Sequence, residues 1–151
     1  MLKKDFSDDF FMQKALEEAK LAADEDEIPV GAVIVAGNQV IGKGHNSVEL
    51  LNDVTAHAEI LALGAASNFM GSKYLENARI YVTLEPCAMC AAALNAAQVR
   101  EIIYGTKDPK KGYSLYQPSL IHPKSKVKRG ILEAECSGLI REFLRKKRKN
   151  G

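Results

Sequence analysis

The sequence contains no tryptophan, only three cysteines in 151 residues, and no apolar run that approaches the ~20 residues needed to span a bilayer. Because the number of cysteines is odd and two of them lie close together, they do not make the disulfide framework of a small secreted protein. Their spacing is more typical of a metal or redox site in a reducing compartment. Near the N-terminus the chain turns acidic where a signal peptide would need its apolar stretch. We therefore expect a protein that has no membrane span and stays in the cytoplasm.

The composition is that of one soluble domain. With 46% hydrophobic and 26% charged residues, the chain 1–151 is long enough to bury a single core. The charge is unevenly distributed, because residues 1–100 carry a net charge of −6 and residues 101–151 a net charge of +8. A basic C-terminal third favours a polyanionic partner such as nucleic acid. A solvated basic tail would produce the same asymmetry.

Helical and strand patterns follow one another along the chain. Ser7 can cap a first helix that starts at Asp8, carries an apolar stripe at helical spacing and ends in the acidic run 24–27. Two strands, 30–36 and 39–45, flank a Gly-Asn dipeptide that suits a hairpin turn. This order predicts an α/β fold, a three-layer α/β/α sandwich around one central mixed sheet of five strands. The remaining elements are expected as a helix over 56–66, a strand over 79–84, a helix opened by Pro86 and ending near 95, strands over 101–104 and 127–132, and a basic C-terminal helix from 133.

Three side chains from two parts of the chain form a candidate metal site. Cys87 and Cys90 stand at i and i+3 at the start of a predicted helix, so both sulfurs face the same way. A helix N-terminus favours the thiolate form, which binds metal. His57 lies at the start of another predicted helix, and two helix starts at one edge of a sheet can aim these ligands at a single point. One imidazole and two thiolates suit Zn²⁺.

The expected zinc site has an open position. A structural site would need a fourth protein ligand, and the candidates, Cys136 in the C-terminal helix and His122 in a loop beside a proline, are poorly placed. Three protein ligands leave a position for water, which is the arrangement of catalytic zinc. Glu59 can then accept the proton of that water and deliver it to a substrate. Because residues i and i+2 point roughly opposite ways on an ideal helix, His57 and Glu59 must both lie in an irregular first turn.

Each half of the pattern has a plainer explanation when it is taken alone. A Cys-x-x-Cys pair also occurs in redox sites and structural zinc sites, and a His-x-Glu pair is common on helix surfaces. The two halves occur here in this order, with a proline before the first cysteine and a strand-then-helix context at both. Together they favour catalysis.

The motifs His57-Ala58-Glu59 and Pro86-Cys87-Ala88-Met89-Cys90 resemble the signature of the zinc-dependent cytidine and deoxycytidylate deaminase superfamily. The resemblance covers nearly the whole chain and is greatest to the bacterial tRNA-specific adenosine deaminases. It implies a cytidine deaminase-like fold with one Zn²⁺ per subunit. It further implies a homodimer that binds the anticodon loop of a tRNA and converts the wobble adenosine to inosine by a zinc-activated water, with Glu59 as the catalytic acid and base. Outside the two motifs, the resemblance rests on segments 27–33, 44–46, 53–60 and 81–87.

The resemblance also implies the residues that hold the substrate. Asn46 would hydrogen-bond the flipped base, and the backbone near Ala58 would help to orient it. Pro29, Val30 and Ala32 would form the pocket wall. The basic residues expected to hold RNA phosphates are Lys107, Lys110, Lys111, Arg145, Lys146 and Arg148.

One loop departs from the family pattern, and two other functions stay open. The family loop is rich in Gly, Ala and Ser where this chain has two lysines and two tyrosines in segment 110–116. A deaminase of free bases or nucleosides, of guanine or cytosine type, would use the same metal site without needing the basic C-terminal third. A non-catalytic, zinc-stabilised RNA-binding module would keep the metal and would not need Glu59.

Overall fold

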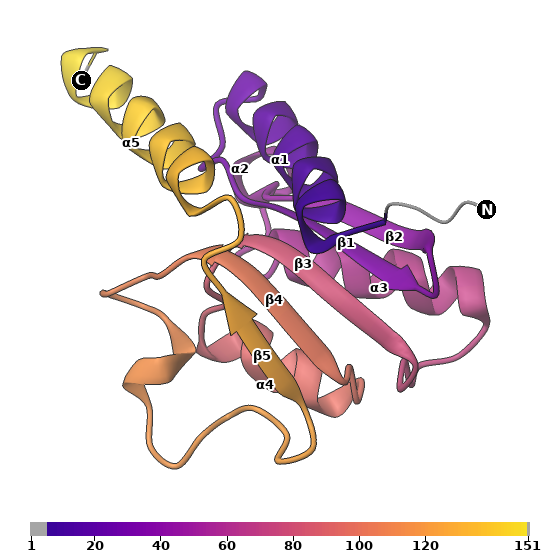
Figure 1. The fold of residues 1–151 in the computed structure, drawn as a ribbon. Helices are drawn as coiled ribbons and strands as arrows, with labels where there is room; N and C mark the ends of the chain where they lie inside the picture. Colours follow the sequence, from indigo (N-terminus) through magenta and orange to yellow (C-terminus); the bar gives the residue numbers. More distant parts are fainter. Residues whose placement is uncertain (1–5, 151) are drawn as a thin grey trace.

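The structure is a computed structural model that describes residues 6–150, so expectations about the first five residues and Gly151 lie outside the described residues. Five strands form one sheet in the order β2-β1-β3-β4-β5 (Figure 1). Strand β1 pairs antiparallel with both β2 and β3, whereas β3, β4 and β5 run parallel. The predicted mixed sheet of five strands is therefore confirmed. The strands are β1 (Gly31–Ala36), β2 (Gln39–His45), β3 (Ala78–Leu84), β4 (Glu101–Thr106) and β5 (Lys126–Arg129).

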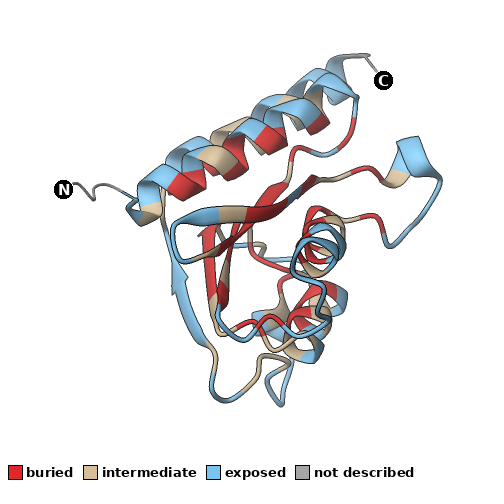
Figure 2. Ribbon diagram, turned by 90° about the vertical axis from the view of Figure 1, so that its right-hand side faces the viewer, coloured by how far each residue is buried: buried red, intermediate tan, exposed pale blue. Residues whose placement is uncertain are grey.

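Helices cover both faces of the sheet, which confirms the predicted three-layer sandwich (Figure 2). One apolar cluster joins α3 and α4 to one face of the sheet, and a second joins α1 and α5 to the other face. Among the described residues, no helix combines the length and the apolar character that crossing a membrane requires. The helices are α1 (Asp8–Asp24), α2 (Val48–Leu51), α3 (Ala58–Met70), α4 (Ala88–Ala96) and α5 (Glu133–Asn150), with a short 3₁₀ helix, η1 (Tyr113–Leu115).

Local signals in the sequence explain where α1 and the hairpin form. Ser7 has an extended backbone and its hydroxyl accepts a hydrogen bond from the N–H of Phe10, so it caps α1 as predicted. The predicted apolar stripe is buried along the side of α1 that faces β1 and β3. Gly37 has a φ of 63° at the first position of the two-residue turn between β1 and β2, which is where a type II′ turn requires a positive φ.

Several predicted boundaries were wrong. The helix expected over 56–66 begins at Ala58 and continues to Met70, where Gly71 ends it with a φ of 66°. The last strand stops at Arg129 because Gly130 and Leu132 both take positive φ values and turn the chain toward α5. The helix expected to open at Pro86 begins at Ala88. Neither α2 nor η1 was predicted, because elements of three or four residues are too short to show a period.

The topology gathers several chain segments at one edge of the sheet. Because β1 is antiparallel to β2 and β3, its first residues lie beside the ends of those two strands, as the pairs Gly31–His45 and Ala32–Val82 show. The parallel strand β4 ends at the same edge, with Thr106 beside Leu84. Both α3 and α4 begin from segments that leave this edge. Ligand sites in open α/β sheets form where carboxyl ends of strands and helix starts meet in this way.

Glycine at position 31 allows α1 to pack directly on the start of β1. A Cβ atom at Gly31 would overlap the backbone of Ala15 and Ala19 in the helix. We expect Gly31→Ala to lower the free energy of unfolding by about 1–3 kcal/mol, because the helix must move away from the sheet. The matched control is Gly64→Ala in α3, where a new Cβ meets nothing within 4 Å, and which should raise the free energy of unfolding by about 0.5–1 kcal/mol. Urea denaturation measures both changes, and equal effects would contradict the close packing.

His45 links the end of β2 to α1 through two carboxylates. Its Nδ1 lies 3.1 Å from Glu18 Oε1, and its Nε2 lies 3.0 Å from Glu25 Oε1. Burial lowers the pKa of His45, but the two carboxylates raise it more, so the pKa lies above its usual value. A group whose pKa is higher in the folded than in the unfolded protein stabilises the fold when it is protonated. This contribution is fully present below the pKa of the unfolded state and is lost as the pH rises through the pKa of the folded state.

The contribution of His45 to stability should therefore depend on pH. We expect His45→Gln to cost more stability at pH ~6 than at pH ~9, by roughly 1 kcal/mol. The difference is small because Glu25 is 41% exposed and solvent screens the pair. Urea denaturation of both proteins across this pH range measures it. A cost that does not change with pH would show that the charged form of His45 makes no contribution.

Candidate active site

His57, Cys87 and Cys90 converge on one point, as their spacing predicted. The Nδ1 atom of His57 lies 3.6 Å from Cys87 Sγ and 3.5 Å from Cys90 Sγ. All three ligand atoms lie within 4.8 Å of one another. His57 precedes the first residue of α3, and Cys87 precedes the first residue of α4, so the start of each helix faces the same small volume.

Residues i and i+2 of an ideal helix point roughly opposite ways. The backbone at the start of α3 explains why His57 and Glu59 can nevertheless lie at one site. His57 is the N-cap of α3, with an extended backbone at φ −78° and ψ 155°, and Glu59 is the second residue of the helix. The prediction that both residues lie in an irregular first turn was right in substance, although His57 lies just outside the helix. Cys87 is likewise the extended N-cap of α4, and Cys90 is its third residue. An N-cap side chain folds back over the third helical residue, which brings the two sulfurs together.

The three side chains shift one another's pKa values. Contacts with Cys90 and His57 lower the pKa of Cys87 to about 4, which favours the thiolate. The neighbouring Cys87 and burial raise the pKa of Cys90. Contact with Cys87 raises the pKa of His57. One imidazole and two sulfurs at this separation form a donor set that fits Zn²⁺.

Among the described residues, the group of candidate ligands has three members. Cys136 is 1% exposed and packs in the apolar cluster that includes Phe11 and Tyr81, on the α1 side of the sheet. His122 accepts a hydrogen bond from the backbone N–H of Lys124 in the loop before β5. Neither residue joins the three ligands, as the sequence predicted. The site therefore has the open donor set of a catalytic metal centre.

Glu59 is buried beside the ligands, at 4% exposure. Burial raises the pKa of Glu59 to about 7. A carboxyl group whose pKa lies near neutrality can both accept and donate a proton, which is what a general acid and base requires. Glu59 also lines the cavity described next, so a substrate in the cavity would be within its reach.

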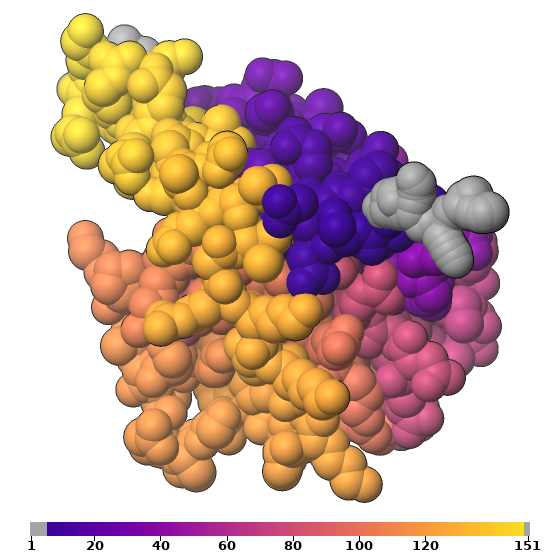
Figure 3. All heavy atoms as spheres, viewed as in Figure 1, coloured from indigo at the N-terminus to yellow at the C-terminus, as the bar shows by residue number. Residues whose placement is uncertain are grey.

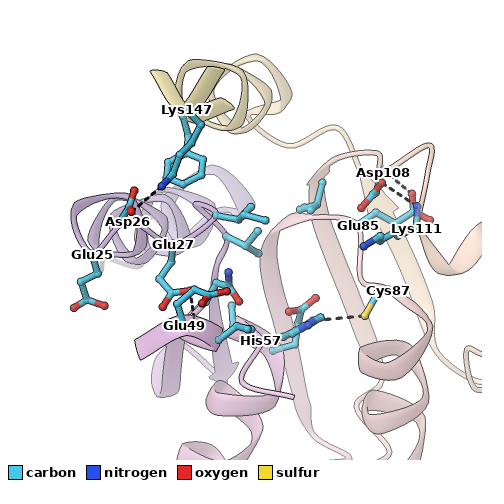
Figure 4. Close-up of a pocket in the computed structure, with 18 residues that line it drawn as sticks. Glu25, Asp26, Glu27, Glu49, His57, Glu85, Cys87, Asp108, Lys111 and Lys147 are labelled. Carbon is cyan, nitrogen blue, oxygen red and sulfur yellow. Dashed lines mark hydrogen bonds and ion pairs between the residues drawn. The ribbon is translucent and has the colours of Figure 1, made fainter. Parts of the chain in front are cut away.

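A cavity of about 650 Å³ opens beside the three ligands (Figure 4). Of the residues that the family resemblance implied for substrate binding, Asn46, Val30 and Ala58 line it. Pro29 is buried and Ala32 is fully buried in the core under α3, and neither is among the lining residues. The role of these five residues in binding a base stays a prediction.

Charged side chains line two sides of the cavity; one side is acidic, and the other carries both signs. The turn after α1 contributes Glu25, Asp26 and Glu27 on one side, and the loop after β4 contributes Asp108 and Lys111 on the other. Figure 4 shows the three acidic residues on one side of His57, and Asp108 and Lys111 on the other side, above Cys87.

Helix α5 reaches the rim of the cavity on the acidic side. Phe143 lines the cavity, and Lys147 Nζ lies 2.7 Å from Asp26 Oδ2. The sequence predicted the helix from its apolar side, but no local signal could show that it would cross to the turn after α1. Figure 3 shows the last part of α5 (yellow) projecting from the body of the molecule.

Two buried carboxylates, for which the sequence indicated no role, hold the segments that form the walls of the cavity. Glu27 is 2% exposed and accepts hydrogen bonds from the backbone N–H groups of Glu49 and Leu50, at the start of α2. Glu85 is also 2% exposed and accepts hydrogen bonds from the N–H groups of Asp108 and Ser114. A carboxylate that follows an apolar strand directly, as Glu85 does, was the one signal in the sequence that could have indicated such a role.

The residues predicted to hold RNA are all exposed, and they lie in two places. Lys107, Lys110 and Lys111 belong to the loop after β4, and Lys111 alone of the three lines the cavity. The other three, Arg145, Lys146 and Arg148, lie on α5. There, Arg145 and Lys146 pair with Glu142 at 2.8 and 3.9 Å.

Comparisons with known proteins agree with this geometry. The family model of the MafB19-like deaminases matches residues 6–148. The chain is 44% identical over 148 residues to a tRNA-specific adenosine deaminase of Aquifex aeolicus, which covers 94% of this chain and 97% of that relative. A solved structure from work on A-to-I editing by tRNA:A34 deaminases at the wobble position matches with a TM-score of 0.81 at 43% identity, over 86% of this chain and 98% of its own. A guanine deaminase from Nitrosomonas europaea matches with a TM-score of 0.82 at 23% identity, over 91% and 84%, which shows a shared fold alone.

Proposed function

This chain belongs to the family that the MafB19-like deaminase model describes, and we propose that within it the chain is a tRNA-specific adenosine deaminase that converts the wobble adenosine to inosine. The observation that carries this function is the convergence of His57, Cys87 and Cys90 beside Glu59 in a cavity. The substrate follows from relatives of this specificity at 36–44% identity over nearly the whole chain.

The metal of this enzyme is Zn²⁺, one ion per subunit, held by His57, Cys87 and Cys90. The proposal is supported by the donor set, because one imidazole and two sulfurs within 4.8 Å are the ligands that zinc prefers. When bound, zinc supplies a Lewis acid that lowers the pKa of a coordinated water toward neutrality.

Glu59 moves the protons of the reaction. Its carboxylate takes a proton from the water that attacks C6 of adenine and delivers it to the ring nitrogen next to that carbon. It then passes the second proton of that water to the amino group, the C6–N bond breaks, and the amino group leaves as ammonia. The pKa of about 7 supports both transfers, because the group can accept and release a proton at the same pH.

The cavity residues bind and orient the base. Asn46 donates and accepts hydrogen bonds with the flipped adenine, and the backbone at Ala58 fixes its plane. Val30 forms the apolar wall, with Pro29 and Ala32 supporting it. A base in a single-stranded anticodon loop leaves its stack at low cost, which suits this cavity.

The RNA backbone lies along the basic loop and α5, at Lys107, Lys110, Lys111, Arg145, Lys146 and Arg148. The protein acts as a homodimer, which the exposed apolar side chains of Leu50, Leu51 and Val54, in and after α2, support. The proposed location is the cytoplasm, which a tRNA substrate supports.

Mass spectrometry of an anticodon stem-loop RNA incubated with the zinc-loaded protein tests the function. We expect a gain of about one dalton at the wobble adenosine, because deamination replaces an amino group with oxygen. Free guanine, cytidine and adenosine are assayed in parallel, because the guanine deaminase fold is shared. Turnover of free bases or nucleosides without turnover of the RNA would overturn the proposal.

A further inference from the structure

Glu85 is a buried carboxylate that the chemistry above does not use. It follows β3 directly, two residues before the ligand Cys87, and is 2% exposed. Its Oε1 accepts a hydrogen bond of 3.0 Å from the N–H of Asp108, and its Oε2 accepts one of 3.0 Å from the N–H of Ser114. One side chain therefore holds both ends of the loop 108–114.

The middle of this loop is packed against the same carboxylate. A Cβ atom at Gly112 would collide with the carboxylate of Glu85. Gly112 also forms an isolated bridge with Cys87, and the N–H of Tyr113 donates to the carbonyl of Pro86 at 2.9 Å. The loop is thus fixed to the short segment that carries the first cysteine ligand.

The loop in turn fixes one lysine at the mouth of the cavity. The Oδ1 of Asp108 accepts hydrogen bonds from the N–H groups of Lys110 and Lys111, which closes a tight turn. Lys111 lines the same cavity as the ligands His57 and Cys87. Figure 4 shows Glu85, Asp108 and Lys111 grouped on the wall that carries Cys87.

We propose that Glu85 is a positioning residue, which acts through Asp108 to hold Lys111 against a phosphate next to the reacting nucleotide. This inference rests on the proposed function. A nucleotide that enters the cavity brings its flanking phosphates to the mouth, where the opposite wall is acidic at Glu25, Asp26 and Glu27. Lys111 offers those phosphates the opposite sign, and the strand of RNA is oriented accordingly.

Glu85 lies in the segment 81–87 that resembles the family, whereas the loop that it holds departs from the family pattern. What is particular to this chain is therefore the lysine that the anchored loop presents. Glu85 acts on RNA binding and not on the ligands, so its loss changes KM more than kcat.

The test compares four zinc-loaded proteins on the anticodon stem-loop: wild type, Glu85→Gln, Lys111→Ala and the double variant. Glutamine retains one acceptor oxygen, but its amide NH₂ group cannot accept a hydrogen bond from the second backbone N–H. The loop is therefore released at one end. We expect each single variant to raise KM by about 10-fold with kcat within about threefold of wild type. The double variant should match the larger single effect, because both changes act on one contact.

The control is Lys73→Ala, which removes the same charge from an exposed position that does not line the cavity. Its KM should stay within about twofold of wild type. The dependence of KM on salt gives a second measurement, because loss of one phosphate contact lowers the slope by about 0.7 for single-stranded RNA. A purely structural role for Glu85 would not change this slope.

The possible failures are distinguishable. No turnover of the RNA by wild type would overturn the proposed function and this inference with it. Wild-type turnover with an unchanged KM in Lys111→Ala would overturn this inference alone, even if Glu85→Gln failed to fold. Additive effects in the double variant, or a fall in kcat without a change in KM for Glu85→Gln, would also overturn it.

Discussion

Glu59→Gln is expected to lower kcat on the anticodon stem-loop by about 10²–10⁴-fold, the range lost when a general acid and base is removed. Glutamine has the shape of the carboxylic acid but neither accepts nor releases a proton at neutral pH. The protein should still bind its zinc, because the ligand atoms come from His57, Cys87 and Cys90. Single-turnover kinetics, metal analysis and RNA binding on the same preparation measure the three quantities.

The control for Glu59 is Glu76→Gln, which removes one carboxylate from the loop before β3, where the side chain is 57% exposed. Its kcat should equal that of wild type. Glu59→Gln should also fold, because a buried carboxylate is costly when ionised and the amide removes that cost. If Glu59→Gln retained full turnover, the proton carrier would be another group. If wild type and variant both bound RNA and neither converted adenosine, the protein would be a zinc-stabilised RNA-binding module.

The chemistry of the site was predictable from the sequence because its signals are local. His57, Glu59, Cys87 and Cys90 lie in two short motifs, and each motif stands where a helix begins. Caps and periodic patterns are set by neighbouring residues, so they can be identified without knowing the fold. Both helices begin two residues later than predicted, at Ala58 and Ala88, so His57 and Cys87 are N-caps. This difference matters for the site because an N-cap and a first-turn residue point in different directions.

The walls of the cavity were not predictable because they depend on contacts between distant segments. Glu27 and Glu85 bind backbone groups more than 20 positions away, and nothing in their own neighbourhood shows which segment will meet them. Phe143 reaches the rim only because α5, which packs against β4 and β3, continues to the turn after α1. The sequence also showed an acidic first part and a basic last part, but only the fold places the run 24–27 opposite Lys111 across one cavity.

The loss of a single cysteine ligand should remove both the metal and the activity. We expect Cys87→Ser to hold less than about one tenth of a zinc ion per chain, because a hydroxyl is a much poorer zinc ligand than a thiolate. Turnover should fall below detection, and the melting temperature should fall as well, since a ligand that binds only the folded state stabilises it. Metal analysis after gel filtration, turnover on the stem-loop and thermal denaturation measure these effects. A chelator should produce the same losses in wild type, and added zinc should reverse them there but not in the variant.

The third cysteine provides the matched control for this result. Cys136 is 1% exposed and burial raises its pKa to about 12, so it stays a neutral thiol in the apolar cluster on the α1 side of the sheet. Cys136→Ala should keep zinc and turnover at wild-type levels while it lowers the free energy of unfolding by roughly 1 kcal/mol, the cost of a small cavity. The comparison separates ligation from the general effect of losing a buried sulfur. Zinc retained in Cys87→Ser, or lost in Cys136→Ala, would mean that the metal lies elsewhere than between the starts of α3 and α4.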